Sequence, residues 1–166
     1  MSKHDGDYIR GILEKIKIKT IMNKDVIKVH EHDELSKAEE IFLAKRIYYL
    51  PVVNQYNKLV GLLSQKYLYK THSPRKIDSD ELAYRPDILI DGNAFYDKEA
   101  LDSFFLRSVM LKNPFTLTEE DSVLTAIFEM AKRKIGCICI IDGEKKVCGM
   151  LTESDLVKLT AQILSS

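Results

Sequence analysis

The chain has 166 residues, of which 45% are hydrophobic and 30% charged, so it can build one compact domain or two small interlocked ones. Its 25 Lys and Arg balance 25 Asp and Glu, and this lack of net charge argues against a nucleic-acid partner. The longest apolar runs are only a few residues and the first residues are polar, so we expect neither membrane insertion nor a secretory signal.

The predicted elements begin with a helix over residues 7–17, in which apolar residues recur at helical spacing. A short strand is predicted over 26–29. Asp33 follows in a polar turn, where its carboxylate is expected to cap the exposed N–H groups of the next helix. That helix is predicted over 35–45, and its apolar spacing indicates one buried face, formed by Leu35, Ala38, Ile41 and Phe42.

Two apolar, β-branched stretches come next, at 49–53 and 59–63, and the polar residues between them predict a hairpin turn. Ser64 is a good N-cap residue and predicts the start of another helix. A connector over 71–96 contains turn signals and is longer than a compact domain requires. It is either an irregular strap, or residues 87–90 within it add a strand or contact a partner chain.

The second half of the chain predicts the same order of elements. A lead-in helix is predicted over 97–105, a strand over 115–117 and a helix over 123–134, with Asp121 as its expected cap. The remaining predicted elements are strands at 137–141 and 147–151, joined as a hairpin, and a closing helix that starts at Thr152.

Residues 18–70 align with residues 106–158 without a gap, at a constant offset of 88. Of these 53 pairs, 11 are identical, among them Met22/Met110, Asp33/Asp121 and Gly61/Gly149. The chain therefore contains a duplicated supersecondary unit of about fifty residues. Two copies are too few for a solenoid, so they are expected to cover each other directly, with pseudo-twofold symmetry.

The order strand, helix, strand, strand, helix, present twice, resembles the cystathionine β-synthase (CBS) domain. The resemblance rests on Met-x-Lys at the opening of each repeat, Leu-Pro-Val-Val at 50–53 and Gly-Met-Leu-Thr-Glu-Ser-Asp-Leu at 149–156. Two such domains in tandem look like a Bateman module, which implies an α/β (α+β) fold of two βαββα repeats packed into one module. The implied divisions are a helical lead-in (1–17), CBS repeat 1 (18–70), a connector with a lead-in helix (71–105), CBS repeat 2 (106–160) and a C-terminal tail (161–166).

The resemblance implies a regulatory module, not an enzyme, that binds an adenosine-containing ligand (AMP, ADP, ATP or S-adenosylmethionine) in a cleft between the repeats. Such a module signals by conformational change, here to an unknown protein in trans, and it requires no cofactor. CBS pairs commonly associate through their helices, so a homodimer is implied as well. No Ser-His-Asp set, Walker loop or dinucleotide-binding glycine motif stands in the sequence to indicate catalysis.

In the family, a closing Ser/Thr-x-x-Asp places a hydroxyl at a helix start and a carboxylate one turn later. The carboxylate can accept ribose hydroxyls, while the hydroxyl and the free N–H groups face phosphate. The second repeat has both groups, and each cleft of a CBS pair joins this motif to the opening and middle strands of the other repeat. The implied ligand-binding set is Thr152, Asp155, Met22, Asp25, Ile27, Tyr48 and Pro51.

A second, weaker cleft is implied by the first repeat, which keeps the hydroxyl of Ser64 but has Tyr67 where the acid belongs. Cys139 also stands where the family usually has Pro. We therefore expect asymmetric occupancy, with the weaker cleft formed by Ser64, Met110, Asn113, Phe115, Gly136 and Cys139.

Each of these assignments has a structural alternative. Thr152 and Asp155 can simply cap a helix, and Tyr48 can either stack on adenine or fill its space. If Tyr48 and Tyr67 fill the clefts, the chain is instead a constitutive dimerisation or scaffold module.

The three cysteines, Cys137, Cys139 and Cys148, suit reduced thiols in a cytoplasmic protein better than a disulfide framework. They have no fourth ligand nearby, so buried packing is favoured over a zinc site, although a redox-responsive regulator is a further alternative. His30 and His32 stand in a solvated turn that the second repeat builds without histidine, so no metal site is expected there either.

Overall fold

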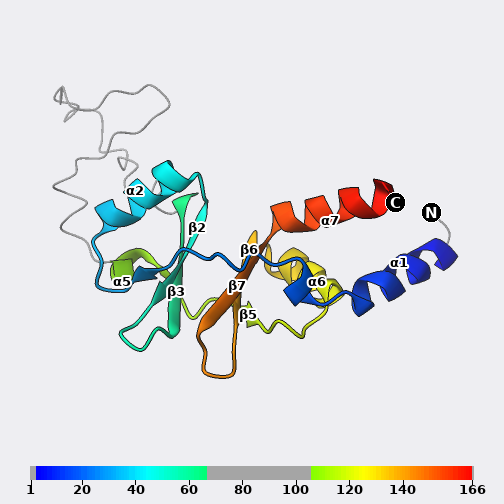
Figure 1. Ribbon diagram of the computed structural model, residues 1–166, viewed down its shortest axis with the longest axis horizontal. Coiled ribbons are helices and arrows are strands. Elements are labelled where there is room, and N and C mark those ends of the chain that lie inside the picture. The colour runs from blue at the N-terminus through cyan, green and yellow to red at the C-terminus, as the bar shows by residue number, and fades with distance from the viewer. Residues whose placement is uncertain (1–2, 67–105, 166) are drawn as a thin grey trace, which may run out of the picture. The chain divides into compact units, whose positions relative to one another are not determined.

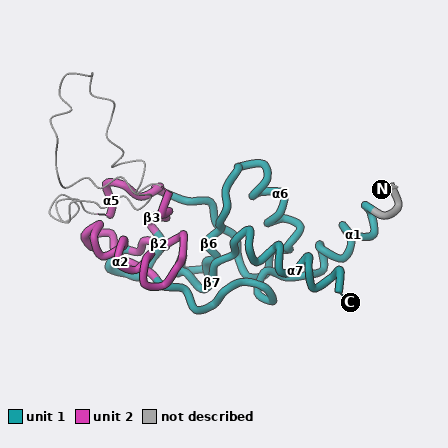
Figure 2. Tube along the Cα trace, turned by 90° about the horizontal axis from the view of Figure 1, so that it is seen from above, with its two compact units in different colours: residues 1–27, 54–59, 113–166 teal, residues 28–53, 60–112 magenta. Residues whose placement is uncertain are grey.

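The chain divides into two compact units, seen in different colours in Figure 2, and the computed structural model describes residues 3–66 and 106–165. Unit 1 comprises residues 1–27, 54–59 and 113–166, and unit 2 comprises residues 28–53 and 60–112.

Three features predicted in the middle of the chain lie outside the described residues. They are the connector at 71–96, the lead-in helix at 97–105 and the side chain of Tyr67.

The described part of unit 1 contains a three-stranded sheet, together with the N-terminal and C-terminal helices of the chain (Figure 1). Its elements in chain order are α1 (Lys3–Lys15), the short 3-10 helix η1 (Ile18–Thr20), β5 (Thr116–Leu117), α6 (Val123–Arg133), β6 (Cys137–Ile141), β7 (Val147–Thr152) and α7 (Glu153–Ser165).

The helix predicted over 7–17 exists as α1, but it begins at Lys3 and ends at Lys15. Its C-terminal limit has a tertiary cause. The N–H of Val123 donates to the carbonyl of Ile16 at 2.9 Å, and Lys17 forms an antiparallel bridge with Ser122. The backbone of residues 16–17 is therefore extended along the second repeat and cannot continue the helix.

The sheet of unit 1 has the order β5-β6-β7. Strands β5 and β6 are parallel, with Thr116 opposite Cys139, and β6 and β7 form the predicted hairpin, with Cys137 opposite Thr152. A register shift follows Ile140, so Cys148 is the extra residue of a β-bulge.

The core of unit 1 lies between this sheet and the apolar face of α6. Ala126 and Met130 of α6 pack against alternate residues of the strands, as expected for one buried helix stripe on one sheet face. Two residues from the first repeat complete the same cluster, whose members are Ile18, Met22, Ala126, Met130, Ile138, Ile140 and Leu151.

Unit 2 repeats this plan with the first repeat. Its elements are β1 (Val29–His30), α2 (Leu35–Lys45), β2 (Tyr49–Val53), β3 (Leu59–Ser64, the first residue of which belongs to unit 1), α5 (Leu106–Val109) and β4 (Leu111–Lys112). They form a sheet of order β1-β2-β3-β4, in which β1 runs parallel to β2 and β4 runs antiparallel to β3. The prediction of a buried face on α2 is confirmed for three residues that are fully buried, Leu35, Ala38 and Phe42.

The segments that open the two repeats are exchanged between the units. The N–H of Ile18, from repeat 1, donates to the carbonyl of Asp121 at 2.9 Å in unit 1. The N–H of Leu106, from repeat 2, donates to the carbonyl of Asp33 at 3.1 Å in unit 2. These two pairs are related by the 88-residue offset. Each repeat therefore binds the opening segment of the other repeat through equivalent hydrogen bonds.

Two methionine–glycine contacts seat these exchanged segments. The side chain of Met22 lies directly on Gly149 of β7, and the side chain of Met110 lies directly on Gly61 of β3. In both places a Cβ on the glycine would overlap the methionine sulfur. Asn23 then exchanges two backbone hydrogen bonds of 2.9 Å with Met150, which aligns the lead-in with the edge of β7.

The strand predicted over 26–29 is wrong at its start, because β1 contains only Val29 and His30. The N–H of Val26 donates to the carbonyl of Lys24 at 3.0 Å. This local bond closes a three-residue turn, which an extended strand cannot contain.

The predicted helix caps are also wrong. Asp33 and Asp121 stand one residue before the N-cap positions, which are Glu34 and Ser122. Each carboxylate instead bonds back into its own turn: Asp33 Oδ2 accepts the N–H of His30 at 2.8 Å, and Asp121 Oδ2 accepts the N–H of Thr118 at 2.7 Å. The N-cap hydroxyl of Ser122 satisfies the N–H of Thr125 at 3.1 Å.

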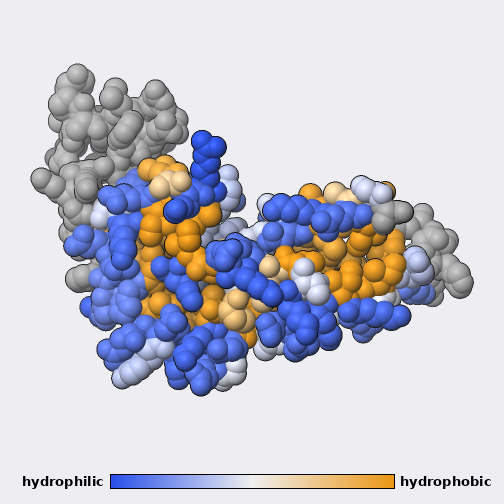
Figure 3. All heavy atoms as spheres, in the orientation of Figure 1, coloured by the Kyte–Doolittle hydropathy of each residue, from blue (hydrophilic) through white to orange (hydrophobic). Residues whose placement is uncertain are grey.

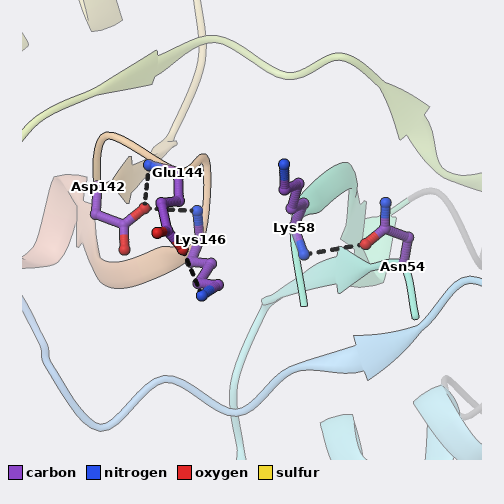
Figure 4. A network of polar contacts seen from close by, with 5 residues as sticks. All are labelled: Asn54, Lys58, Asp142, Glu144 and Lys146. Atoms are coloured by element: carbon purple, nitrogen blue, oxygen red, sulfur yellow. Dashed lines mark hydrogen bonds and ion pairs between the residues drawn. The ribbon is translucent and has the colours of Figure 1, made fainter. Parts of the chain in front are cut away.

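The two hairpin turns share one internal design (Figure 4). Asn54 Oδ1 accepts the N–H of Lys58 at 3.1 Å, and Asp142 Oδ1 accepts the N–H of Lys146 at 2.9 Å. Lys58 and Lys146 are also Cα partners in an antiparallel bridge, and Lys146 forms an ion pair with Glu144. The asparagine or aspartate at the start of each turn therefore sets the turn geometry in both repeats.

Candidate functional site

The predicted ligand-binding residues divide between the units. Met22, Asp25, Ile27, Thr152 and Asp155 all belong to unit 1. The other two predicted members, Tyr48 and Pro51, belong to unit 2.

Thr152 and Asp155 form a closed turn at the start of α7. Asp155 Oδ2 accepts two hydrogen bonds from Thr152, one from its N–H at 2.9 Å and one from its hydroxyl at 2.7 Å. The N–H of Glu153 donates to the carbonyl of Gly136 at 3.1 Å, which ties the start of α7 to the residue that precedes β6. The threonine hydroxyl thus orients the carboxylate, and the phosphate contact that the family resemblance implies for it stays a prediction.

The second carboxylate oxygen of Asp155, Oδ1, takes no bond from Thr152. Oδ1 lies 3.6 Å from Lys158 Nζ, and the Asp155 side chain is 17% exposed. An ionised carboxylate has about four acceptor positions, and the bonds from Thr152 use only the Oδ2 side. Asp155 is therefore a fixed, partly buried carboxylate whose Oδ1 is paired with Lys158 and has further acceptor capacity.

The same local bonding occurs at Thr118 and Asp121, where Asp121 Oδ2 accepts the N–H and the hydroxyl of Thr118 at 2.7 and 2.8 Å. The bonding by itself is thus a local turn motif. The Thr152–Asp155 turn differs in its position, because Asp155 stands within the first turn of α7, whereas Asp121 precedes the N-cap of α6.

Among the predicted lead-in residues, Met22 contacts β7, where it lies on Gly149. Met22 is only 8% exposed and packs on Gly149, so it is a core residue of unit 1. Asp25 is exposed, and its N–H donates to Asn23 Oδ1 at 3.0 Å. Ile27 is half-buried.

In unit 2, Pro51 is buried within β2 and Tyr48 precedes that strand. The Tyr48 side chain is 67% exposed, and its carbonyl accepts the N–H of Gln65 at 2.9 Å. Tyr48 therefore does not fill an internal cavity of unit 2.

The residues predicted for the weaker cleft also divide between the units. Ser64 ends β3 and Met110 covers Gly61, both in unit 2. In unit 1, Asn113 is exposed with a left-handed backbone (φ 49°), and Cys139 is fully buried. The remaining two residues, Gly136 and Phe115, stand just before β6 and β5.

Arg133, which the sequence did not single out, covers Phe115. Its guanidinium carbon lies 4.0 Å from the centre of the Phe115 ring, and its Nε donates to Glu129 Oε2 at 2.5 Å. Phe115 also packs against the core cluster of unit 1. The 88-residue offset places Ile27 and Lys45 at the corresponding positions, so the repeat pattern alone does not reveal an aromatic–guanidinium pair.

The cysteines do not gather into one site. Cys137 and Cys139 are buried, whereas Cys148 stands at the bulge and packs against the cluster that contains Ile138 and Ile140. The hydrogen bond with Cys139, together with burial, raises the pKa of the Cys137 thiol far above its ordinary value. A redox role that needs an acidic, exposed thiol is therefore not supported at Cys137.

The described residues also contain no cluster of three or more side chains suited to hold a metal ion. The rings of His30 and His32 lie 5.5 Å apart between centres, and His30 Nδ1 accepts the N–H of His32 at 3.3 Å. Within residues 3–66 and 106–165, no helix is long and apolar enough to cross a bilayer.

The described residues therefore define a small mixed α+β module in which the order strand, helix, strand, strand occurs twice, and the second repeat ends in the closing helix α7. The family model of the CBS domain matches residues 18–71 and 106–161, which is more than half of the chain. The chain belongs to the CBS domain family.

Sequence relatives are distant. An uncharacterized protein of Methanocaldococcus jannaschii is 28% identical, with 90% of this chain and 98% of that protein covered. A homoserine O-acetyltransferase of Methanococcus vannielii is 22% identical over 86% of this chain. This chain spans only 24% of that enzyme, about a quarter of its length.

Solved structures with the same fold are CBS domain pairs and related proteins. The CBS domain of a membrane protein from Sphaerobacter thermophilus has a TM-score of 0.71 at 24% identity, with 95% of each chain covered. The CBS domain pair of protein MJ0100, in complex with 5′-methylthioadenosine and S-adenosyl-L-methionine, has a TM-score of 0.65 at 22% identity, with 87% of this chain and 98% of that chain covered. CBSX2 in complex with AMP has a TM-score of 0.67 at 18% identity, with 89% of this chain and 98% of that chain covered.

Proposed function

We propose that the chain is a regulatory module that binds an adenosine-containing ligand, with the Asp155 carboxylate as the ribose contact, and that it signals to a partner protein by conformational change. Catalysis is not part of this proposal. A ligand shifts the conformation of such a module only by its difference in affinity for the two states.

The carboxylate of Asp155, held by Thr152 at the start of α7, carries the proposal. Thr152 holds the carboxylate through Oδ2, so the side chain is already ordered when a ligand arrives. Ribose presents two adjacent hydroxyls, and a fixed carboxylate can accept hydrogen bonds from such a pair. Because the side chain is pre-ordered, little conformational entropy is lost on binding.

The relatives support the class of ligand. The domain pair of MJ0100 is complexed with two adenosine compounds, and CBSX2 is complexed with AMP. All three ligands contain an adenosine group, so a ribose acceptor is the feature that they would share. For the present chain, adenosine compounds are therefore the first ligands to test.

The test compares Asp155→Ala with Asp121→Ala, by calorimetric titration of AMP, ATP and S-adenosylmethionine. Both substitutions remove the same two hydrogen bonds from a threonine, so both should lower stability by a similar amount, about 1.5–3 kcal/mol, the range for hydrogen bonds to a charged group. Only Asp155→Ala should abolish ligand binding. Wild-type binding by Asp155→Ala would refute the ribose contact.

A thermal-shift panel tests the module as a whole. A ligand at a hundred times its dissociation constant should stabilise the protein by about 2.7 kcal/mol. If no adenosine compound shifts the melting temperature, the sensor proposal fails and the scaffold alternative is favoured.

A further inference from the structure

We propose that unit 2 contains a pH-sensitive contact, in which protonation of His32 loosens the opening segment of repeat 2 (residues 106–112) from the turn that binds it. The inference is independent of the proposed adenosine ligand, because it concerns a contact within unit 2 alone.

Each unit binds the opening segment of the other repeat through one polar turn, which we call the docking turn. In unit 1 the docking turn is residues 118–121, and the N–H of Lys19 donates to the carbonyl of Glu119 at 3.1 Å. The Lys19 ammonium also forms an ion pair with Glu120, with 2.7 Å between Nζ and Oε1. The hydrogen bond and the charge of each partner raise the pKa of Lys19 and lower the pKa of Glu120. The docking turn of unit 1 thus attracts the cation of the segment that it binds.

In unit 2 the docking turn is residues 30–33, and the same backbone bond is present. The N–H of Arg107 donates to the carbonyl of Glu31 at 3.2 Å. The 88-residue offset places Arg107 where unit 1 has the paired lysine, and His32 where unit 1 has the paired glutamate. Because the backbone of Arg107 is bonded to the residue beside His32, the two side chains extend from neighbouring backbone positions. The cation of the opening segment is therefore kept, while an imidazole replaces the acid.

Protonation of His32 reverses the electrostatics of this contact. Histidine is the side chain whose charge ordinarily changes between pH 5 and 8, whereas the guanidinium of Arg107 stays charged. His32 is exposed, and hydrophilic residues cover the side of unit 2 that carries α5 (Figure 3), so solvent protons reach the ring. At acidic pH an imidazolium stands at the position from which unit 1 attracts a cation, and like charges repel.

The other charged groups of the docking turn do not oppose this effect. Asp33 forms an ion pair with Lys37 at 2.9 Å. Burial raises the pKa of Asp33, but the N–H of His30 and the ammonium of Lys37 lower it overall, so Asp33 stays ionised at acidic pH. Together with Glu31 and Glu34, these groups are close neighbours of His32 along the chain, and they surround it whether or not residues 106–112 are bound. Arg107 is the charge that docking adds.

His30, the second histidine of the docking turn, acts in the same direction. The centres of the His30 and His32 rings lie 5.5 Å apart, and His30 Nδ1 accepts the N–H of His32 at 3.3 Å. Protonation of Nδ1 turns this acceptor into a donor and breaks the bond. Acid therefore loosens the backbone of the docking turn while it also generates repulsion with Arg107.

The contact is important for unit 2 because the same segment places Met110 on Gly61 and pairs β4 with β3. Leu106 is fully buried in the docked segment. In unit 1 the ion pair persists on acidification, since Lys19 lowers the pKa of Glu120. Acid thus loosens one of the two exchanged segments and leaves the other in place.

The test is amide hydrogen exchange of the full chain by NMR, at about pH 7.5 and 5.5, corrected for the intrinsic pH dependence of exchange. The protection factors of the Leu106 and Arg107 amides should fall about two- to fivefold at the lower pH, the effect expected of one exposed charge pair. The amides of Ile18 and Lys19, bound by the docking turn of unit 1, are the internal reference and should keep their protection.

Four variants assign the effect to the histidine. His32→Gln cannot titrate and should abolish most of the change with pH, and His32→Glu supplies the acid of unit 1 and should raise the protection at both pH values. His30→Asn keeps a side-chain acceptor but cannot titrate, so it should retain the part of the change that His32 causes. His4→Gln is the matched control, since it removes a histidine from α1 in unit 1 and should behave like the wild type.

Equal protection of Leu106 and Arg107 at the two pH values in the wild type would overturn the proposal. A wild-type loss of protection in His32→Gln would assign the pH dependence to another group, and the proposal would be wrong. It would also be wrong if Ile18 and Lys19 lost protection to the same extent, because acid would then act on the whole fold. None of these outcomes bears on the ribose contact at Asp155.

Discussion

At the residue scale, a methionine lies on a glycine at equivalent positions of both repeats. Met22 covers Gly149, and Met110 covers Gly61. Both glycines stand inside strands, where a residue without a side chain ordinarily weakens the sheet. Here the absence of a side chain allows the methionine in the opening segment of the other repeat to lie directly on the strand backbone.

Replacing Gly149 by alanine should therefore destabilise the protein by about 1–3 kcal/mol, because the new methyl group overlaps the Met22 sulfur and forces repacking. Urea denaturation measures the loss. Gly143→Ala is the matched control and should be neutral, because no atom lies within 4 Å of a Cβ at that position.

The cause is tested by a second substitution. In the double variant Met22→Ala with Gly149→Ala, the cost should be smaller than the sum of the two single costs, since the clash is absent. Additive costs would show that the two residues are not coupled.

The aspartates show where residue patterns mislead. Asp33 and Asp121 precede predicted helices and were expected to cap them, but each closes its own turn instead. Burial opposes ionisation of Asp33, yet the N–H of His30 and the ammonium of Lys37 lower its pKa overall. A helix cap and a turn acceptor require the same residue type, so the sequence could not distinguish them.

At the scale of elements, α2 and α6 occupy equivalent positions but begin differently. Both have 11 residues and both end in a left-handed residue, Arg46 or Lys134. Helix α6 has a capping serine, whereas Glu34 at the start of α2 makes no cap hydrogen bond with its side chain.

Ser122→Ala should accordingly lower the free energy of unfolding by about 1 kcal/mol, because the N–H of Thr125 loses its acceptor. Glu34→Ala is the matched substitution at α2 and should change stability by much less. Thermal or chemical denaturation of the two variants checks the difference, and equal costs would contradict the cap assignment.

At the scale of the whole molecule, each unit combines one repeat with the segment that opens the other repeat. Residues 18–23 pack in unit 1 with the second repeat, and residues 106–112 pack in unit 2 with the first. The core of unit 1 thus contains Ile18 and Met22 from the other half of the sequence. Neither repeat, as the family model delimits it, supplies a complete core of its own.

None of the residues of the closing helix α7 is buried in the single chain. Val157 and Leu164, seven residues apart and so on one face, are 68% and 81% exposed. We propose that this face helps to form the homodimer that the family resemblance implies.

Lysine at both Val157 and Leu164 should then convert a dimer into a monomer in sedimentation experiments, because four added charges cannot be buried across a twofold interface. Gln162→Lys, at an exposed position of the same helix, should leave the assembly unchanged. A wild-type chain that sediments as a monomer would contradict the proposal.

Local order alone determined much of this protein. Helix α2, strand β2 and strand β6 match their predicted limits, because apolar periodicity and β-branched runs depend only on near neighbours along the chain. The duplication, and with it the family, is likewise readable as a constant offset.

Tertiary structure decided where α1 ends and which ring Arg133 covers. These features depend on contacts between residues more than a dozen positions apart, and spacing along the sequence does not encode them. The Arg133–Phe115 contact is the clearest case, since its two residues are ordinary surface and strand types until the fold stacks one on the other.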